Sequence, residues 1–170
     1  MELLKPKIYQ KIIFSINYDK LLKQNIKILL FEIDNTISST KEKYPNTKTK
    51  ELFEHLKEKG FNIFIITNAL KKRATIFKIE LDVKTYHFSM KPSPRNYKKL
   101  IKENKLKIVE CAAIGDQIFT DIKGANKQGI LSILVDPISE SEFITTKINR
   151  IKENKLIEKT KIIKKGEYYE

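Results

Sequence analysis

Short, uniformly apolar runs alternate with longer amphipathic segments along most of this chain. Four runs have the length of strands rather than helices, at 26–31, 61–67, 111–114 and 131–135. Strands that are apolar at every position, rather than at alternate positions, are typical of a parallel sheet covered by helices on both faces. The pattern predicts an α/β fold, a three-layer Rossmann-like sandwich with a central, mostly parallel sheet.

Helices are expected between these strands, and capping residues mark several of their ends. Asn46 is expected to cap a helix that ends at Gly60. Ser93 and Pro94 have the residue types of a helix cap and a first helical position. The other expected elements are a short strand over 86–88 and helices over 7–17, 19–22, 69–80, 119–128 and from 141 onward.

The 170 residues suffice for one domain with a buried core. We expect a single domain over 1–170, with short helices at about 7–24 and a basic helix and tail at about 141–170. Core elements fill the intervals 32–67 and 67–91, so no separate cap domain is expected. No apolar stretch approaches the ~20 residues of a membrane-spanning helix, and the first ten residues lack a signal-peptide core. The expected location is therefore cytoplasmic.

The net charge of +13 comes almost entirely from lysine, because only three of the 34 basic residues are arginines. Lysines spread over solvated helix faces explain this excess better than specific nucleic-acid binding, which favours arginine and interleaved aromatic residues. Association with RNA through bulk charge is a weaker alternative. A positive field attracts phosphorylated small molecules or lipid head groups, and favours peripheral contact with an anionic membrane at its inner face.

Polar and charged residues follow the predicted strands, at the edge where an open α/β sheet binds its ligand. They are Glu32, Asp34, Asn35, Thr36, Thr67, Asn68, Lys91, Gly115, Asp116, Gln117 and Asp121. Clustered carboxylates require a cation, and a chain with one cysteine and two histidines offers mainly oxygen ligands. Hard oxygen ligands select Mg²⁺. Lysine, threonine and Mg²⁺ together suit a dianionic phosphate.

This constellation resembles the haloacid dehalogenase-like phosphohydrolase superfamily (HAD), and most closely its IIIA-type, YqeG-like branch, related to phosphatidylglycerophosphate phosphatases. The matching phrases cover nearly the whole chain. They are IDNTI, ITNALKKR, MKPSPRNY, IGDQIFTDIKGANKQGI, LSILVDPIS and FITTKINR. The resemblance implies a phosphomonoester hydrolase with a carboxylate nucleophile, acting on phosphatidylglycerophosphate or another anionic phosphomonoester.

The resemblance also assigns catalytic roles. Asp34 is the implied general acid and later the base for water. Thr67 is implied to bind a phosphoryl oxygen, and Lys91 to neutralise charge on the phosphate and the nucleophile. The nucleophile position itself falls on Glu32.

The implied cofactor is Mg²⁺, held by Glu32, by the backbone carbonyl of Asp34 and by Asp116. Asp121 is expected either to support the site from behind or to cap the following helix. His55, His87 and Cys111 are expected to be structural. The expected substrate contacts are Thr67, Asn68 and Lys91.

Glu32 departs from the family pattern, which has aspartate at this position. One extra methylene moves the attacking oxygen by roughly one bond length, and a misplacement of ~1 Å can cost ~10²-fold in rate. Glu32 is then either a weaker nucleophile or part of a catalytically weakened or inactive HAD-fold binding protein. A register slip that makes Asp34 the nucleophile ranks last, because Asn35 and Thr36 fit the family phrase with Asp34 in second place.

Overall fold

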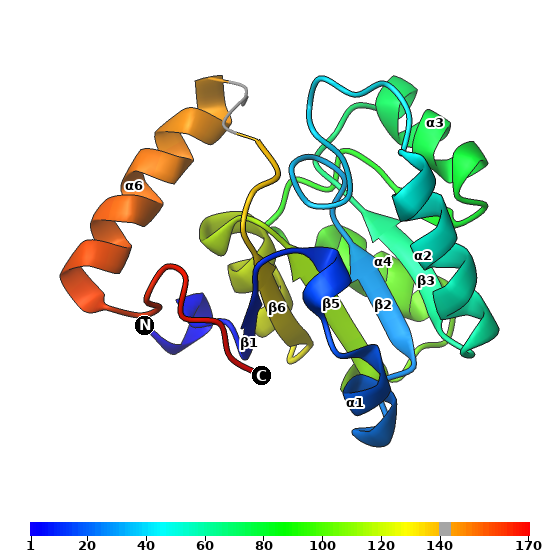
Figure 1. Ribbon diagram of the computed structural model, residues 1–170, viewed down its shortest axis with the longest axis horizontal. Helices are drawn as coiled ribbons and strands as arrows, with labels where there is room; N and C mark the ends of the chain where they lie inside the picture. The colour runs from blue at the N-terminus through cyan, green and yellow to red at the C-terminus, as the bar shows by residue number, and fades with distance from the viewer. Residues whose placement is uncertain (140–143) are drawn as a thin grey trace.

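A parallel sheet of six strands forms the centre of the computed structural model, which describes residues 1–139 and 144–170. The strand order is β1-β6-β5-β2-β3-β4, and every strand pairing is parallel (Figure 1). The predicted α/β sandwich around a parallel sheet is therefore confirmed. The strands are β1 (Ile8–Gln10), β2 (Ile28–Phe31), β3 (Asn62–Ile66), β4 (Lys84–Tyr86), β5 (Cys111–Gly115) and β6 (Leu131–Val135).

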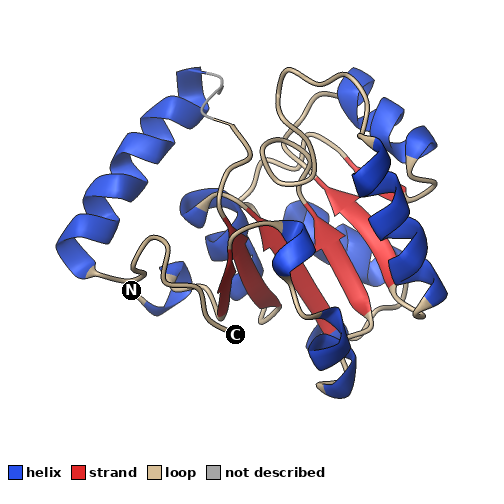
Figure 2. Cartoon of the chain, viewed as in Figure 1, coloured by secondary structure: helices blue, strands red, loops and turns tan. Residues whose placement is uncertain are grey.

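Helices cover both faces of the sheet, which gives the predicted three layers (Figures 1 and 2). Successive residues of β2 point to opposite faces. Phe31 packs into the core with Phe53 and Phe77 of the helices on one face, whereas Leu30 packs with Tyr97 on the other. The helices are α1 (Tyr18–Lys23), α2 (Thr47–Glu58) and α3 (Lys71–Glu80) on the first face, and α4 (Arg95–Glu103) and α5 (Lys123–Asn126) on the second.

Strand β2 lies in the middle of the sheet, between β5 and β3. The chain builds β3 and β4 outward on one side of β2 and then crosses to build β5 and β6 on the other. This reversal of strand order is a topological switch point, where ligands of open α/β sheets bind beyond the carboxyl ends of the strands. The topology thus places the segments that follow β2 and β5 at one shared site.

The segment 7–17 forms a strand and a short 3₁₀ helix, Ile13–Ser15, so the helix expected there is wrong. Residues Ile8–Gln10 pair with β6 as the edge strand β1. This pairing supplies tertiary hydrogen bonds that outweigh the weak helical spacing of the isoleucines. Further 3₁₀ turns lie at Glu2–Leu4 and Ile108–Glu110.

The helix caps agree with the sequence only in part. Asn46 caps α2 as predicted, because its side chain accepts a hydrogen bond from the Thr49 amide at 2.9 Å. Helix α1 is capped by Asn17, whose side chain accepts from the Lys20 amide, rather than by Asp19. Both caps satisfy an amide that lacks a partner within its helix.

Two further helices differ from expectation at their ends. Helix α4 begins at Arg95, so Pro94 is its cap and not its first residue. The helix expected over 119–128 is divided into a π-helical turn, η4 (Ile118–Ile122), and α5. A π-helical turn within a helix is often found at a functional site.

Helix α6 (Ile144–Thr160) lies beside the β1–β6 edge of the sheet (Figure 1). The start expected at 141 lies outside the described residues. Two apolar residues of this helix, Ile148 and Ile151, are 48% and 57% exposed. The tail after α6 returns to the sheet, where Tyr169 forms an antiparallel bridge with Tyr9 of β1.

Candidate active site

Four of the predicted site residues follow directly on, or soon after, the carboxyl ends of neighbouring strands. Glu32 follows β2, Thr67 follows β3, Lys91 lies in the loop after β4, and Asp116 follows β5. Each of these side chains is buried. Parallel strands end at the same edge, so the fold brings residues distant in sequence together there.

The carboxylate of Glu32 accepts hydrogen bonds from several directions. Its Oε1 accepts from the Thr67 hydroxyl and from the Ile33 amide at 2.6 Å. Its Oε2 lies 2.6 Å from Lys91 Nζ and accepts from the Asn68 amide at 3.4 Å. The bond to the adjacent Ile33 amide shows that the side chain curls back over its own backbone.

Lys91 bridges two buried carboxylates. Its Nζ lies 2.6 Å from Glu32 Oε2 and 2.6 Å from Asp121 Oδ1, and it donates to the Ile66 carbonyl at 2.9 Å. Burial alone lowers the pKa of Lys91, but Asp121 and Glu32 outweigh burial and raise the pKa above its ordinary value. The two carboxylates therefore favour the charged form of Lys91 at the centre of the site.

Asp121 combines the two roles that the sequence left open. Besides its ion pair with Lys91, its Oδ2 accepts from the Gln117 amide at 3.0 Å, at the start of η4. Gly115 makes this approach feasible, because a Cβ at position 115 would overlap the Asp121 carboxyl group. Asp121 thus supports Lys91 from behind the site and also caps a helical turn.

Asp34, the implied general acid, is held by an arginine that the sequence analysis did not single out. Arg73 Nε lies 2.6 Å from Asp34 Oδ1, while its other nitrogens donate to the Ser39 and Glu42 carbonyls. Burial raises the pKa of Asp34, the charge of Glu32 adds to this effect, and Arg73 opposes it. A raised pKa favours the protonated form that a general acid needs.

Asp116 is held by a second arginine, Arg150 of α6. Arg150 donates to Asp116 Oδ2 and, at 2.7 Å, to the Asp116 carbonyl. The Thr36 hydroxyl donates to Asp116 Oδ1 at 3.1 Å. Burial raises the pKa of Asp116 to about 8, although Arg150 acts in the opposite direction.

Arg73 and Arg150 were not predicted as site residues from the sequence. The rarity of arginine could have indicated them. The chain has only three arginines, and two of them bind carboxylates of this site. Asn68 was expected to bind substrate. In the structure its Oδ1 accepts from the Lys91 amide at 2.8 Å, so it fixes the loop that carries Lys91.

The donor set matches the chemistry of Mg²⁺, because carboxylate and carbonyl oxygens are its preferred protein ligands. Within residues 1–139 and 144–170, no three Asp, Glu, His or Cys side chains are arranged to share one ion. The acids are instead paired with cationic side chains. These pairs join Glu32 and Asp121 to Lys91, Asp34 to Arg73, and Asp116 to Arg150.

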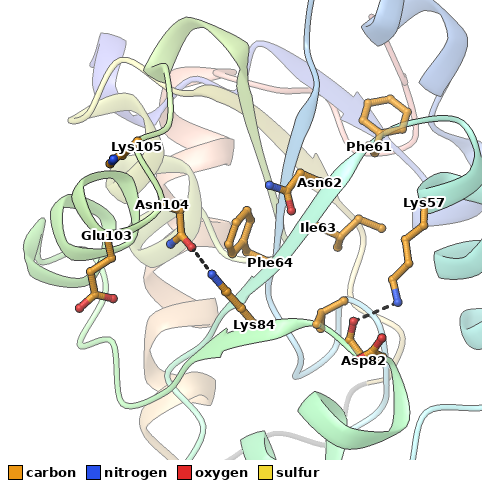
Figure 3. A pocket seen from close by; sticks show the side chains of 11 residues that line it. Lys57, Phe61, Asn62, Ile63, Phe64, Asp82, Lys84, Glu103, Asn104 and Lys105 are labelled. Atoms are coloured by element: carbon orange, nitrogen blue, oxygen red, sulfur yellow. Dashed lines mark hydrogen bonds between the residues drawn. The ribbon is translucent and has the colours of Figure 1, made fainter.

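Two hollows in the protein surface are lined by none of the site residues Glu32, Thr67, Lys91 and Asp116. One, of about 500 Å³, is lined by Asn62 and Lys84 at the amino ends of β3 and β4, the end of the sheet opposite the site (Figure 3). A second, of about 520 Å³, borders the loop before Lys91 and is lined by Phe88 and Met90.

No helix among the described residues is long and apolar enough to cross a bilayer.

Known proteins resemble this chain at the levels of family, sequence and fold. The model of the haloacid dehalogenase-like hydrolases matches residues 4–129. Over 152 residues the chain is 30% identical to "Probable phosphatase YqeG" of Bacillus subtilis, covering 89% of this chain and 88% of that protein. Over 157 residues it is 22% identical to phosphatidylglycerophosphate phosphatase 1 of Arabidopsis thaliana, covering 86% of this chain and 45% of the relative.

The fold is similar to that of an uncharacterized protein from Listeria monocytogenes serotype 4b, whose crystal structure is known. The TM-score is 0.53 at 14% identity, and the match covers 78% of this chain and 99% of the other. This likeness concerns the fold alone.

Proposed function

The chain belongs to the haloacid dehalogenase-like hydrolase family, and we propose that it hydrolyses phosphoric monoesters with Mg²⁺ at the cluster around Lys91. The observation that carries this proposal is the bridge from Lys91 to Glu32 and Asp121. A buried ammonium beside a buried carboxylate lets an anionic nucleophile and an anionic phosphate approach each other.

Glu32 is the proposed nucleophile. One of its oxygens bonds to phosphorus while the bond from phosphorus to the ester oxygen breaks, which forms an acyl-phosphate. Lys91 offsets the charge that gathers between carboxylate and phosphate. The Thr67 hydroxyl, now bound to Glu32, turns to a phosphoryl oxygen once phosphate enters.

Asp34 moves the protons. Its carboxyl proton passes to the leaving oxygen and releases an alcohol. The resulting carboxylate then takes a proton from water, whose oxygen bonds to phosphorus as the bond to Glu32 breaks. Inorganic phosphate leaves, and Glu32 and protonated Asp34 are restored. Arg73 keeps Asp34 oriented for both transfers.

Glu32, the Asp34 carbonyl and Asp116 are the residues that would hold Mg²⁺. When bound, Mg²⁺ would offset negative charge on the phosphoryl group and help to orient it. The chemistry of these oxygens supports the assignment.

An anionic lipid phosphate such as phosphatidylglycerophosphate is the proposed substrate class. The loops that carry Asn68 and Lys91 also carry exposed apolar side chains: Leu70 is 70% exposed, Phe88 59% and Met90 49%. The Phe88 amide donates to the Ala69 carbonyl, so these loops lie side by side. Exposed apolar groups on a protein of net charge +13 suit peripheral contact with an anionic membrane.

Phosphate release tests this proposal directly. The purified protein is assayed with phosphatidylglycerophosphate in anionic vesicles and with soluble glycerol 3-phosphate, each with Mg²⁺ or with a chelator, beside Asp34→Asn. We expect Mg²⁺-dependent release that Asp34→Asn abolishes and that is faster on the vesicles. Equal or faster turnover of the soluble ester contradicts the lipid class. No turnover above Asp34→Asn on either substrate contradicts the hydrolase.

The alternative, an inactive HAD-fold binding protein, is not favoured by the comparisons with known proteins. It rests on Glu32 alone. A protein of this kind would bind a phosphomonoester without hydrolysing it.

A further inference from the structure

We propose that Arg150 occupies the cation position at Asp116, so that binding of a divalent cation there releases the amino-terminal half of α6. This inference rests on the proposed Mg²⁺ site and adds a conformational device to it. Arg150 lies beyond residues 4–129, the part that the family model matches.

The oxygens of Asp116 are already engaged. Arg150 donates to Oδ2 and to the backbone carbonyl, and Thr36 donates to Oδ1. The Asp116 side chain is fully buried. Each oxygen keeps a second lone pair, but a cation that enters comes to lie beside the guanidinium that makes two of these three contacts.

Glu153 provides an alternative partner for Arg150. Its Oε2 lies 3.3 Å from Arg150 Nη1, and its Oε1 accepts from the Phe119 amide at 2.7 Å. Glu153 is only 2% exposed although it lies on the same surface helix. When Arg150 leaves Asp116, its guanidinium thus retains a carboxylate one helical turn away.

Helix α6 is attached unevenly along its length. Its carboxyl-terminal half packs through Leu156 and Ile157 against the cluster that contains Tyr9. In its other half, Ile148 and Ile151 face solvent. Among the side chains described in that half, Arg150 therefore makes the main connection to the active site, and loss of this contact frees that half first.

Charge repulsion decides the sign of the coupling. Arg150 and Mg²⁺ are both cations that need the same carboxylate, so each weakens the binding of the other. Couplings between two binding events are typically 5- to 150-fold. If Arg150 instead held Asp116 in place for the ion, its removal would weaken Mg²⁺ binding.

Isothermal titration with MgCl₂ at constant ionic strength separates these cases. Arg150→Ala is expected to bind Mg²⁺ about tenfold more tightly than the parent. Lys152→Ala, which removes a charge from an exposed position on the same helix, is expected to match the parent. Equal or weaker Mg²⁺ binding by Arg150→Ala overturns the proposal.

Arg150→Gln serves if the alanine variant does not fold, since it removes the charge but keeps part of the packing of the side chain. Its Mg²⁺ affinity is expected to rise severalfold, and an unchanged or lower affinity overturns the proposal.

Hydrogen exchange gives a second readout that does not depend on activity. In the parent, Mg²⁺ is expected to speed amide exchange over residues 148–152, and in Arg150→Ala this effect is expected to vanish. Slower exchange with Mg²⁺ in the parent overturns the coupling. If Mg²⁺ binds but Arg150→Ala does not change its affinity, only the coupling is overturned. If Mg²⁺ binds to none of the variants, the proposed function is contradicted as well.

Discussion

Lys91 Nζ lies 2.6 Å from Glu32 Oε2, although the two residues are 59 positions apart in the sequence. Both side chains are almost completely buried, at 1% and 6% exposure. A buried ion pair contributes little against an apolar replacement of both partners, but loss of one partner leaves an uncompensated charge. The contact therefore makes fold stability depend on an active-site residue.

Lys91→Met is expected to lower the free energy of unfolding by about 3–5 kcal/mol, because Glu32 and Asp121 lose their shared cation. Urea unfolding measures the change. Lys99→Met is the matched control, since Lys99 forms an exposed pair with Glu103 on α4, and its effect is expected below about 0.5 kcal/mol. Equal effects of the two variants would show that the Lys91 bridge adds no stability.

Glu32→Asp is expected to change the rate of phosphate release by less than about tenfold, below the ~10²-fold that a full 1 Å displacement would cost. The reason is the curled side chain of Glu32, whose Oε1 accepts from the Ile33 amide at 2.6 Å. The curl takes up the extra methylene and keeps the carboxylate near the position of a shorter side chain. Steady-state kinetics of parent, Glu32→Asp and Glu32→Gln check this, with no turnover expected from the glutamine variant. Activity in Glu32→Asp beside an inactive parent would instead identify the parent as a binding protein.

Glu153 is expected to make stability fall as the pH rises through the weakly acidic range. Burial raises its pKa from 4.5 to about 7, although the Phe119 amide and Arg150 oppose the shift. The folded state thus binds the proton more tightly than the unfolded state, so the stability from this group is complete below pH 4.5 and is lost by about pH 7. The loss is at most about 3 kcal/mol.

Urea unfolding at a series of pH values compares the parent with Glu153→Gln. The decline between these pH limits is expected to be shallower in the variant, because glutamine does not titrate. Parallel curves for the two proteins would contradict the assignment to Glu153.

Cys111 is expected to resist thiol reagents in the folded protein. It lies buried in β5, and burial raises the pKa of its thiol to about 12, so the reactive thiolate is scarce at neutral pH. A chromogenic disulfide reagent at pH 8 is expected to label it only in denaturant. Rapid labelling of the native protein would show that the strand opens locally.

The sequence predicts the core of the fold because its strands are continuous apolar runs, and all four residues of β2 are buried. Strand β1 was missed because three residues carry too little pattern, and their state depends on pairing with β6. In the site, Glu32 and Lys91 were found from their places after strands. Arg73 and Arg150 were not, because their side chains reach the site from helix faces, where a basic residue normally points to solvent.

The bridge between Tyr9 and Tyr169 has a consequence for self-association. An open edge strand offers unpaired backbone groups on which another copy can add its own strand. Here the tail that follows α6 blocks the β1 edge, while the other edge, β4, is only three residues long and begins with Lys84. The tail that follows α6 therefore protects the sheet from edge-to-edge aggregation.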